Sequence, residues 1–87
     1  MTYSADYSED EQGDGIEIDL EMLREDLISE LQAINQYQEH IDTIGEDEAR
    51  YVLEHIRDDE KEHIAELIKL IRKLDPTQDQ KFEKEEL

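Results

Sequence analysis

Apolar side chains recur along most of this chain at intervals of three and four residues. That spacing places them on one side of an α-helix. One such stripe runs through residues 23–44 and a second through residues 56–74. No segment shows the sustained alternation of apolar and polar residues that marks a half-buried strand,. The pattern therefore predicts an all-α fold class built on two amphipathic helices.

Residues that cap or interrupt helices set the expected boundaries. The first helix is expected over residues 19–44, with Asp19 as its N-cap and Gly45 as its C-terminal stop,. The second is expected over residues 46–74, because the residue before Pro76 is disfavoured in the helical region,. So short a loop between two long helices favours an antiparallel hairpin.

Composition divides the chain into three parts. Residues 1–18 are acidic, contain two of the three glycines and lack a helical period, so a disordered tail is expected there,. Residues 19–76 form the expected helical hairpin. Residues 77–87 are expected to add a short C-terminal helix or tail, with Thr77 as its cap and Phe82 as its one large apolar anchor.

Length and charge limit what the chain does. An 87-residue chain without cysteine buries a thin core, so metal binding through oxygen and nitrogen ligands, oligomerisation or both are expected,. A net charge of −18 repels phosphate groups, which argues against nucleic-acid and membrane partners,. No apolar run approaches the roughly 20 residues of a membrane span, and no secretory leader is visible, so a cytoplasmic location is expected,.

Three polar residues interrupt the two stripes near their middles: Glu30 in the first, and Glu60 and His63 in the second. The first stripe comprises Leu23, Leu27, Glu30, Ile34, Tyr37, Ile41 and Ile44, and the second comprises Ile56, Glu60, His63, Leu67, Leu70 and Leu74. Burying an unpaired carboxylate costs several kcal/mol, so these side chains require a compensating partner.

A divalent cation is one such partner, because carboxylate oxygen and imidazole nitrogen are its usual ligands where cysteine is absent. Glu60 and His63 lie one turn apart on the same side of their helix, and Glu30 is expected to face them across the hairpin. Di-iron carboxylate bundles use two such glutamates and two Glu-x-x-His pairs. Two copies of the chain, related by a two-fold axis, would complete that set and form a four-helix bundle.

A second interpretation needs no metal. Polar residues in a helical seam often fix register and oligomeric state, and a glutamate and a histidine satisfy each other by hydrogen bonding. The chain would then be a metal-independent helical dimerisation or adaptor module. The residues alone leave both interpretations open.

Two segments resemble a known family. The segments SELQAINQYQEHID (residues 29–42) and RDDEKEHIAELIKLIRKLDP (residues 57–76) are similar to encapsulated ferritins. The similarity covers roughly residues 20–76 and is most specific in the Glu-Leu-x-Ala-(Ile/Val)-x-x-Tyr and (Asp/Glu)-Glu-Lys-Glu-His motifs. Members of that family are two-helix relatives of ferritin and rubrerythrin that work inside encapsulin shells.

The resemblance implies a ferroxidase that oxidises Fe(II) to Fe(III) with O2. Its di-iron centre would form between two chains, with Glu30, Glu60 and His63 as metal ligands and Tyr37 nearby, although Tyr37 equally suits an ordinary core position. Calcium, zinc or manganese can occupy the same ligands. Homodimers would assemble into a decamer-like ring inside a cytoplasmic encapsulin nanocompartment, where the ferric product is stored. A di-metal peroxidase or catalase-like activity is the alternative on the same site.

The sequence also departs from the family pattern. Gln32 and Gln36 stand where some relatives have an acid and an aromatic, which puts an outer metal site in doubt, although Glu39 and His40 are candidates to replace it. His40 and His55 are expected to face solvent. No shell-targeting tail is recognisable after residue 87, so truncation, a peptide elsewhere or fusion to a shell protein are the open explanations.

Overall fold

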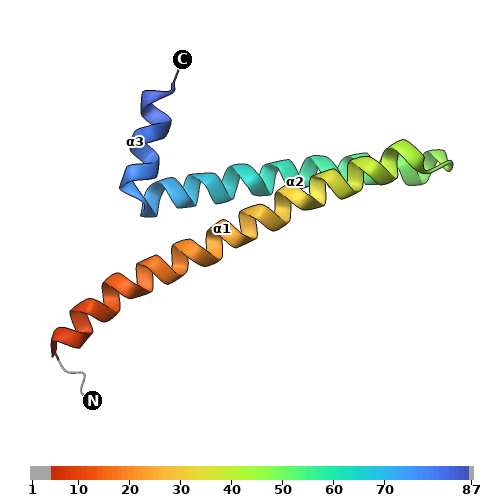
Figure 1. The fold of residues 1–87 in the computed structure, drawn as a ribbon. Helices are drawn as coiled ribbons and strands as arrows, with labels where there is room; N and C mark the ends of the chain where they lie inside the picture. Colours follow the sequence, from red (N-terminus) through yellow and green to blue (C-terminus); the bar gives the residue numbers. More distant parts are fainter. Residues whose placement is uncertain (1–4, 87) are drawn as a thin grey trace.

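The computed structural model describes the backbone of residues 5–86 and the side chains of residues 15–86. It contains α1 (Ala5–Thr43), α2 (Asp47–Leu74) and α3 (Pro76–Lys84), and no strand within the described residues. Helices α1 and α2 form an antiparallel hairpin, and α3 leaves the end of α2 across the hairpin's long direction (Figure 1). The all-α prediction and the hairpin are confirmed.

Helix α1 begins at Ala5, well before the predicted N-cap at Asp19. Its first turns therefore extend beyond the end of α2 (Figure 1). The predicted tail over residues 1–18 falls partly on residues 1–4, which lie outside the described structure, and that division of the chain stays a prediction.

Side chains, not a glycine conformation, hold the turn between α1 and α2. Gly45 does not adopt the positive φ expected of a glycine stop. Instead, Glu46 caps α2 by accepting a hydrogen bond from the Ala49 N–H at 2.6 Å. Arg50 reaches back and donates to the Ile44 carbonyl at 2.5 Å. The predicted position of the turn is correct, but its predicted mechanism is wrong.

Asp75 organises the opposite end of the hairpin. Its backbone N–H donates to the Ile71 carbonyl at 2.8 Å, and its carboxylate accepts from the Gln78 N–H at 3.1 Å and from Arg24 at 3.0 Å. The Gln78 bond, followed by the Arg24 contact, lowers the pKa of Asp75. Asp75 thus ends α2, caps α3 and ties both to α1. The predicted cap at Thr77 is wrong by two positions, although the short C-terminal helix is present.

The hairpin has a thin core. Within the described residues, only Leu20, Ile41 and Ile71 are buried hydrophobic side chains. The molecule measures 61 × 38 × 14 Å, so it is little thicker than one helix,. Solvent reaches 6863 Å² of its surface, whereas a compact protein of this mass exposes about 5,400 Å²,. One hairpin alone therefore leaves much of its apolar surface uncovered.

The packed side of α2 is rotated slightly from the predicted stripe. Ile71 is buried and Ile64 is half-buried, whereas His63 and Leu70 are exposed. The helix carries apolar residues at both 70 and 71, so spacing alone could not decide which of them meets α1. The predicted stripe on α2 therefore lies along the border between its packed side and solvent.

Candidate metal centre

Three side chains from the middles of α1 and α2 converge. His63 Nδ1 lies 2.9 Å from Glu30 Oε2, across the hairpin, and 3.4 Å from Glu60 Oε1 on its own helix. One ligand atom from each residue falls within 4.8 Å of the others. This is the one gathering of three or more potential metal ligands in the part of the chain that the structure describes. The structure thus brings together the three residues that interrupt the apolar stripes.

The cluster opens toward one side of the hairpin. The side chain of Glu60 is 16% exposed and that of Glu30 is 25% exposed, whereas that of His63 is 50% exposed. A hollow of about 430 Å³ adjoins it, lined by Asp26, Ser29, Glu30, His63, Glu66, Leu67 and Leu70. The carboxylates therefore lie deeper than the imidazole, and the imidazole stands at the rim of a partly apolar depression.

The side of α2 that carries His63 includes two exposed apolar side chains. Val52 and Leu70 are 47% and 40% exposed, and they lie three turns before and two turns after His63 along the same side of the helix,. The acids Asp59 and Glu66 are also exposed on this side, so the surface around the cluster is mixed.

Proximity of the acids changes their titration. A hydrogen bond with the Glu30 carboxyl, then burial and the negative charge of Glu30, raise the pKa of Glu60. The hydrogen bond to Glu30 also raises the pKa of His63, aided by the charges of Glu30 and Glu60. Both shifts favour the protonated side chains when no cation is bound. Two carboxylates and one imidazole at these distances suit a divalent cation, which would compete with protons for the same atoms.

Affinity for a divalent cation is expected to increase with pH. Protons compete with the metal while His63 is protonated, and its pKa lies above the ordinary value of 6.5,. Binding of Mn²⁺ can be measured by isothermal titration calorimetry between about pH 6 and pH 8. The affinity should increase as the pH rises, and binding should release protons. His55→Ala should preserve this dependence and His63→Ala should flatten it. An unchanged affinity across that range would contradict the assignment of His63 as a ligand.

Other predicted residues lie outside the cluster. Tyr37 is half-buried on α1, two turns beyond Glu30, and does not belong to the gathered group, so its role stays a prediction. His40 and His55 are exposed, as predicted. The Nε2 atom of His55 lies 3.9 Å from Oδ2 of Asp59. Four residues bear on a possible outer metal site. All four are exposed and lie outside the gathered group: Gln32, Gln36, Glu39 and His40.

Arg57 is a residue near the site that the sequence reading missed. Its side chain is 20% exposed and donates to Gln38 Oε1 on α1 at 2.8 Å and to Asp58 at 3.0 Å. It lies one turn before Glu60 on the same side of α2, a spacing that could have indicated its position. Arg57 thus links the two helices beside the acidic cluster.

Comparisons with known proteins identify the family of this chain. The profile of the EncFtn-like family matches residues 7–86. The chain belongs to the EncFtn-like family. The resemblance to encapsulated ferritins predicted from the two motifs is therefore confirmed. No solved structure gave a significant match.

Two curated proteins of Myxococcus xanthus (strain DK1622) are similar to this EncFtn-like chain. The encapsulin nanocompartment cargo protein EncC is 43% identical over 56 residues, which are 64% of this chain and 43% of EncC. The encapsulin nanocompartment cargo protein EncB is 33% identical over 66 residues, which are 76% of this chain and 42% of EncB. The chain thus spans less than half the length of either relative.

None of the helices described is both long enough and apolar enough to cross a membrane.

Proposed function

We propose that this EncFtn-like chain is a ferroxidase that binds Fe(II) as its substrate between two copies and oxidises it with O2. The observation that carries the proposal is the cluster of Glu30, Glu60 and His63 at an uncovered side of the hairpin. Each copy supplies one glutamate and one Glu-x-x-His pair, which is half of a di-iron ligand set. Membership of the EncFtn-like family supports the same reading.

Dimerisation would complete both the site and the core. A two-fold axis near the cluster would bring two sets of Glu30, Glu60 and His63 together and make a four-helix bundle. The same contact would cover Val52 and Leu70, which lie on the same side of α2 as His63 and are exposed in one hairpin. Burial of such apolar side chains favours association, and the loss of translational, rotational and side-chain freedom offsets part of that gain.

The ligands would act through charge and proton balance. Four carboxylates from two copies would balance the charge of two Fe(II) ions, with either the Glu60 pair or the Glu30 pair shared between them. Each His63 would bind one ion after losing its proton. Hard anionic oxygen ligands stabilise Fe(III) more than Fe(II), which favours oxidation. Two Fe(II) ions would give up one electron each, and one O2 would accept both electrons with two protons to form hydrogen peroxide.

The named role of the relatives extends the proposal to a partner. EncC and EncB are encapsulin nanocompartment cargo proteins. We propose that this chain likewise works inside a cytoplasmic encapsulin shell, as dimers joined in a decamer-like ring. A four-helix bundle made of two thin hairpins has no cavity for a mineral, so storage of the ferric product requires such a container.

One observation favours a second candidate. His63 and Glu30 already form a 2.9 Å contact, which satisfies both groups without a metal, as a metal-independent dimerisation module would require. Iron stoichiometry separates the two functions, because such a module binds no defined number of ions. A di-metal peroxidase or catalase-like protein would instead consume hydrogen peroxide faster than O2.

Aerobic addition of ferrous salt to the full chain tests the proposal. Ferric absorbance is expected to develop faster than in buffer, after binding of one iron ion per chain, and prior addition of Zn²⁺ should slow it by occupying the same ligands. The control is protein to which NaCl has been added at equal ionic strength, because a monovalent cation competes far less for these ligands. Oxidation no faster than in buffer would rule the ferroxidase out.

A further inference from the structure

The charges of the chain are strongly segregated. Residues 1–23 contain eight Asp and Glu and no Lys or Arg. Residues 69–84 contain five of the nine Lys and Arg and only three acids. Residues 15–23 and residues 69–84 both lie at the open end of the hairpin, where α1 extends past α2 and α3 begins (Figure 1). This end of the protein thus combines exposed acids on α1, Glu17 and Glu21 among them, with a basic surface on α2 and α3.

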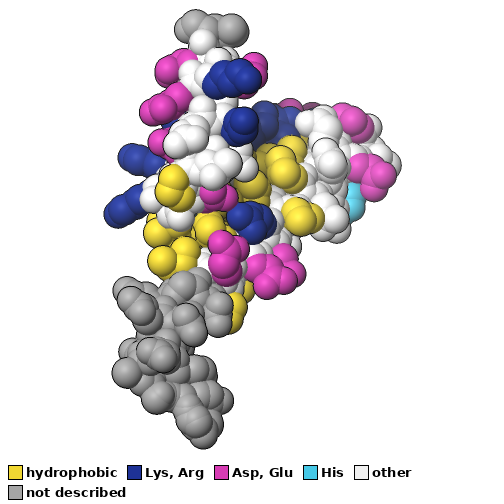
Figure 2. Space-filling view, turned by 60° about the vertical axis from the view of Figure 1, so that its left-hand side comes forward, with side chains coloured by type: hydrophobic (Ala, Val, Ile, Leu, Met, Phe, Trp, Pro, Cys, Tyr) yellow, Lys and Arg dark blue, Asp and Glu magenta, His cyan; other side chains and the backbone are white. Residues whose placement is uncertain are grey.

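The basic surface is a groove on α2 beside the start of α3, here called the α2–α3 groove. It has a volume of about 530 Å³ and is lined by Ala65, Ile68, Lys69, Arg72, Lys73 and Asp79. Figure 2 shows the same end of the molecule, with Lys and Arg side chains over α3 and the adjoining end of α2 and apolar side chains where the helices meet.

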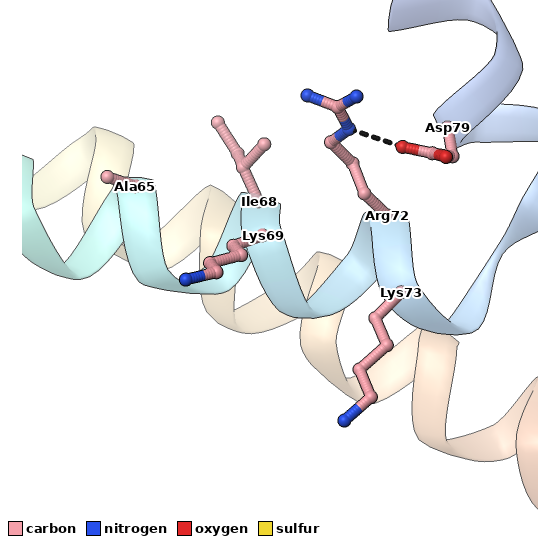
Figure 3. Close-up of a pocket in the computed structure, with 6 residues that line it drawn as sticks. All are labelled: Ala65, Ile68, Lys69, Arg72, Lys73 and Asp79. Atoms are coloured by element: carbon pink, nitrogen blue, oxygen red, sulfur yellow. Dashed lines mark hydrogen bonds and ion pairs between the residues drawn. The ribbon is translucent and has the colours of Figure 1, made fainter.

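Only part of that basic charge is used within the chain. Arg72 donates to Asp79 at 2.6 Å and lies 4.8 Å from the centre of the Phe82 ring, so it holds α3 in place. Lys69 and Lys73 point away from this bond (Figure 3) and form no ion pair with any described residue. The groove therefore combines two available ammonium groups with an apolar floor at Ala65 and Ile68.

Residues 17–22 of α1 present the complementary pattern. Glu17 and Glu21 are exposed and lie four residues apart, as Lys69 and Lys73 do. Ile18 and Met22, also four apart, are 54% and 51% exposed on the neighbouring side of the helix,. An acidic pair beside an apolar pair thus matches the basic pair and apolar floor of the groove in chemistry, and the acidic pair also matches the basic pair in spacing.

We propose that the α2–α3 groove binds residues 17–22 of α1 from a second copy of this chain. Glu17 and Glu21 would pair with Lys69 and Lys73, and Ile18 and Met22 would cover Ala65 and Ile68. The apolar floor favours an amphipathic helix over a small inorganic anion, which gains nothing from apolar contact. A chain cannot place its own residues 17–22 in its own groove. Those residues belong to one continuous helix that packs along α2, and this helix leaves the open end in a different direction from α3 (Figure 1).

This contact is independent of the candidate metal centre. It uses none of Glu30, Glu60 and His63, so it would join copies whether or not a cation is bound. Together with a metal-containing dimer contact, it would connect dimers into larger assemblies. Its failure and the failure of the ferroxidase proposal are therefore distinguishable.

A charge-swap experiment on the full chain tests the proposal. Sedimentation velocity in low salt, with a chelator present, should show association of the unmodified chain that about 0.5 M NaCl weakens. The double variant Lys69→Glu/Lys73→Glu should weaken that association at least tenfold, and so should Glu17→Lys/Glu21→Lys. Combining all four changes should restore most of it. Lys81→Glu/Lys84→Glu is the matched control on α3, with the same charge change outside the groove, and should weaken it far less.

The outcomes separate the alternatives. Restoration in the combined variant, with helical circular dichroism and ferrous oxidation retained in each variant, would support the contact. Equal effects of the groove variant and the α3 control would overturn it, because net charge would then be the cause. Binding of inorganic phosphate that is lost in Lys69→Glu/Lys73→Glu while self-association persists would also overturn it and reassign the groove to an anion.

Discussion

Replacing Glu60 or His63 by alanine is expected to reduce the initial rate of ferrous oxidation by roughly a hundredfold or more, since even loss of an outer partner of a metal ligand often costs 10- to 100-fold. Glu60 lies deepest in the cluster, and its loss removes two carboxylates from a dimer. Loss of His63 removes the nitrogen ligand and leaves the two acids without their 2.9 and 3.4 Å contacts. The measurement is ferric absorbance after aerobic addition of ferrous salt.

Matched controls lie on the same helix. Glu62→Ala and His55→Ala remove the same types of side chain from exposed positions of α2 and should leave the initial rate within about twofold, because exposed substitutions away from special features change little,. Rates for Glu60→Ala and His63→Ala that match these controls would remove the ferroxidase proposal.

Chelation is expected to break the dimer and lower its melting temperature. A cation at a hundred times its Kd stabilises the bound state by about 2.7 kcal/mol. For a chain of this size that corresponds to upwards of about 10 °C. The mass should be followed by sedimentation velocity in about 0.5 M NaCl, which screens exposed charge contacts such as those of the α2–α3 groove.

His63→Ala provides the control for that experiment, because a chain without the imidazole should respond far less to chelation. A dimer whose mass and melting temperature are the same with and without chelator would instead identify a metal-independent dimerisation module. The 2.9 Å contact between His63 and Glu30 would then be its register-setting interaction.

The convergence of Glu30, Glu60 and His63 was more predictable from the sequence than the details of packing. Glu30, Glu60 and His63 stand out because a carboxylate or imidazole among apolar positions requires a partner, and this argument depends only on helical spacing. Their convergence within 4.8 Å followed once the hairpin was correctly inferred. Tyr37, by contrast, would fit the apolar stripe both as an ordinary core side chain and as a side chain near a metal centre, so spacing could not assign it a role.

The errors arose where local signals compete. Asp19 and Asp75 are both good helix caps by residue type, but Asp19 lies inside α1, whereas Asp75 caps α3 and also pairs with Arg24 across the hairpin. Gly45 indicated the turn but not its conformation, which Arg50 and Glu46 determine. On α2, adjacent apolar residues at 70 and 71 gave two possible packed sides, and only the position of α1 decides between them.

An anomalous difference map, recorded at the iron absorption edge from crystals of the iron-loaded full chain, tests the central claim most directly. The account predicts two iron peaks related by a two-fold axis between chains, each bound by Glu30, Glu60 and His63 side chains contributed by both copies. Iron held within a single hairpin, or no iron near these residues while Glu30 and His63 remain hydrogen-bonded, would contradict it.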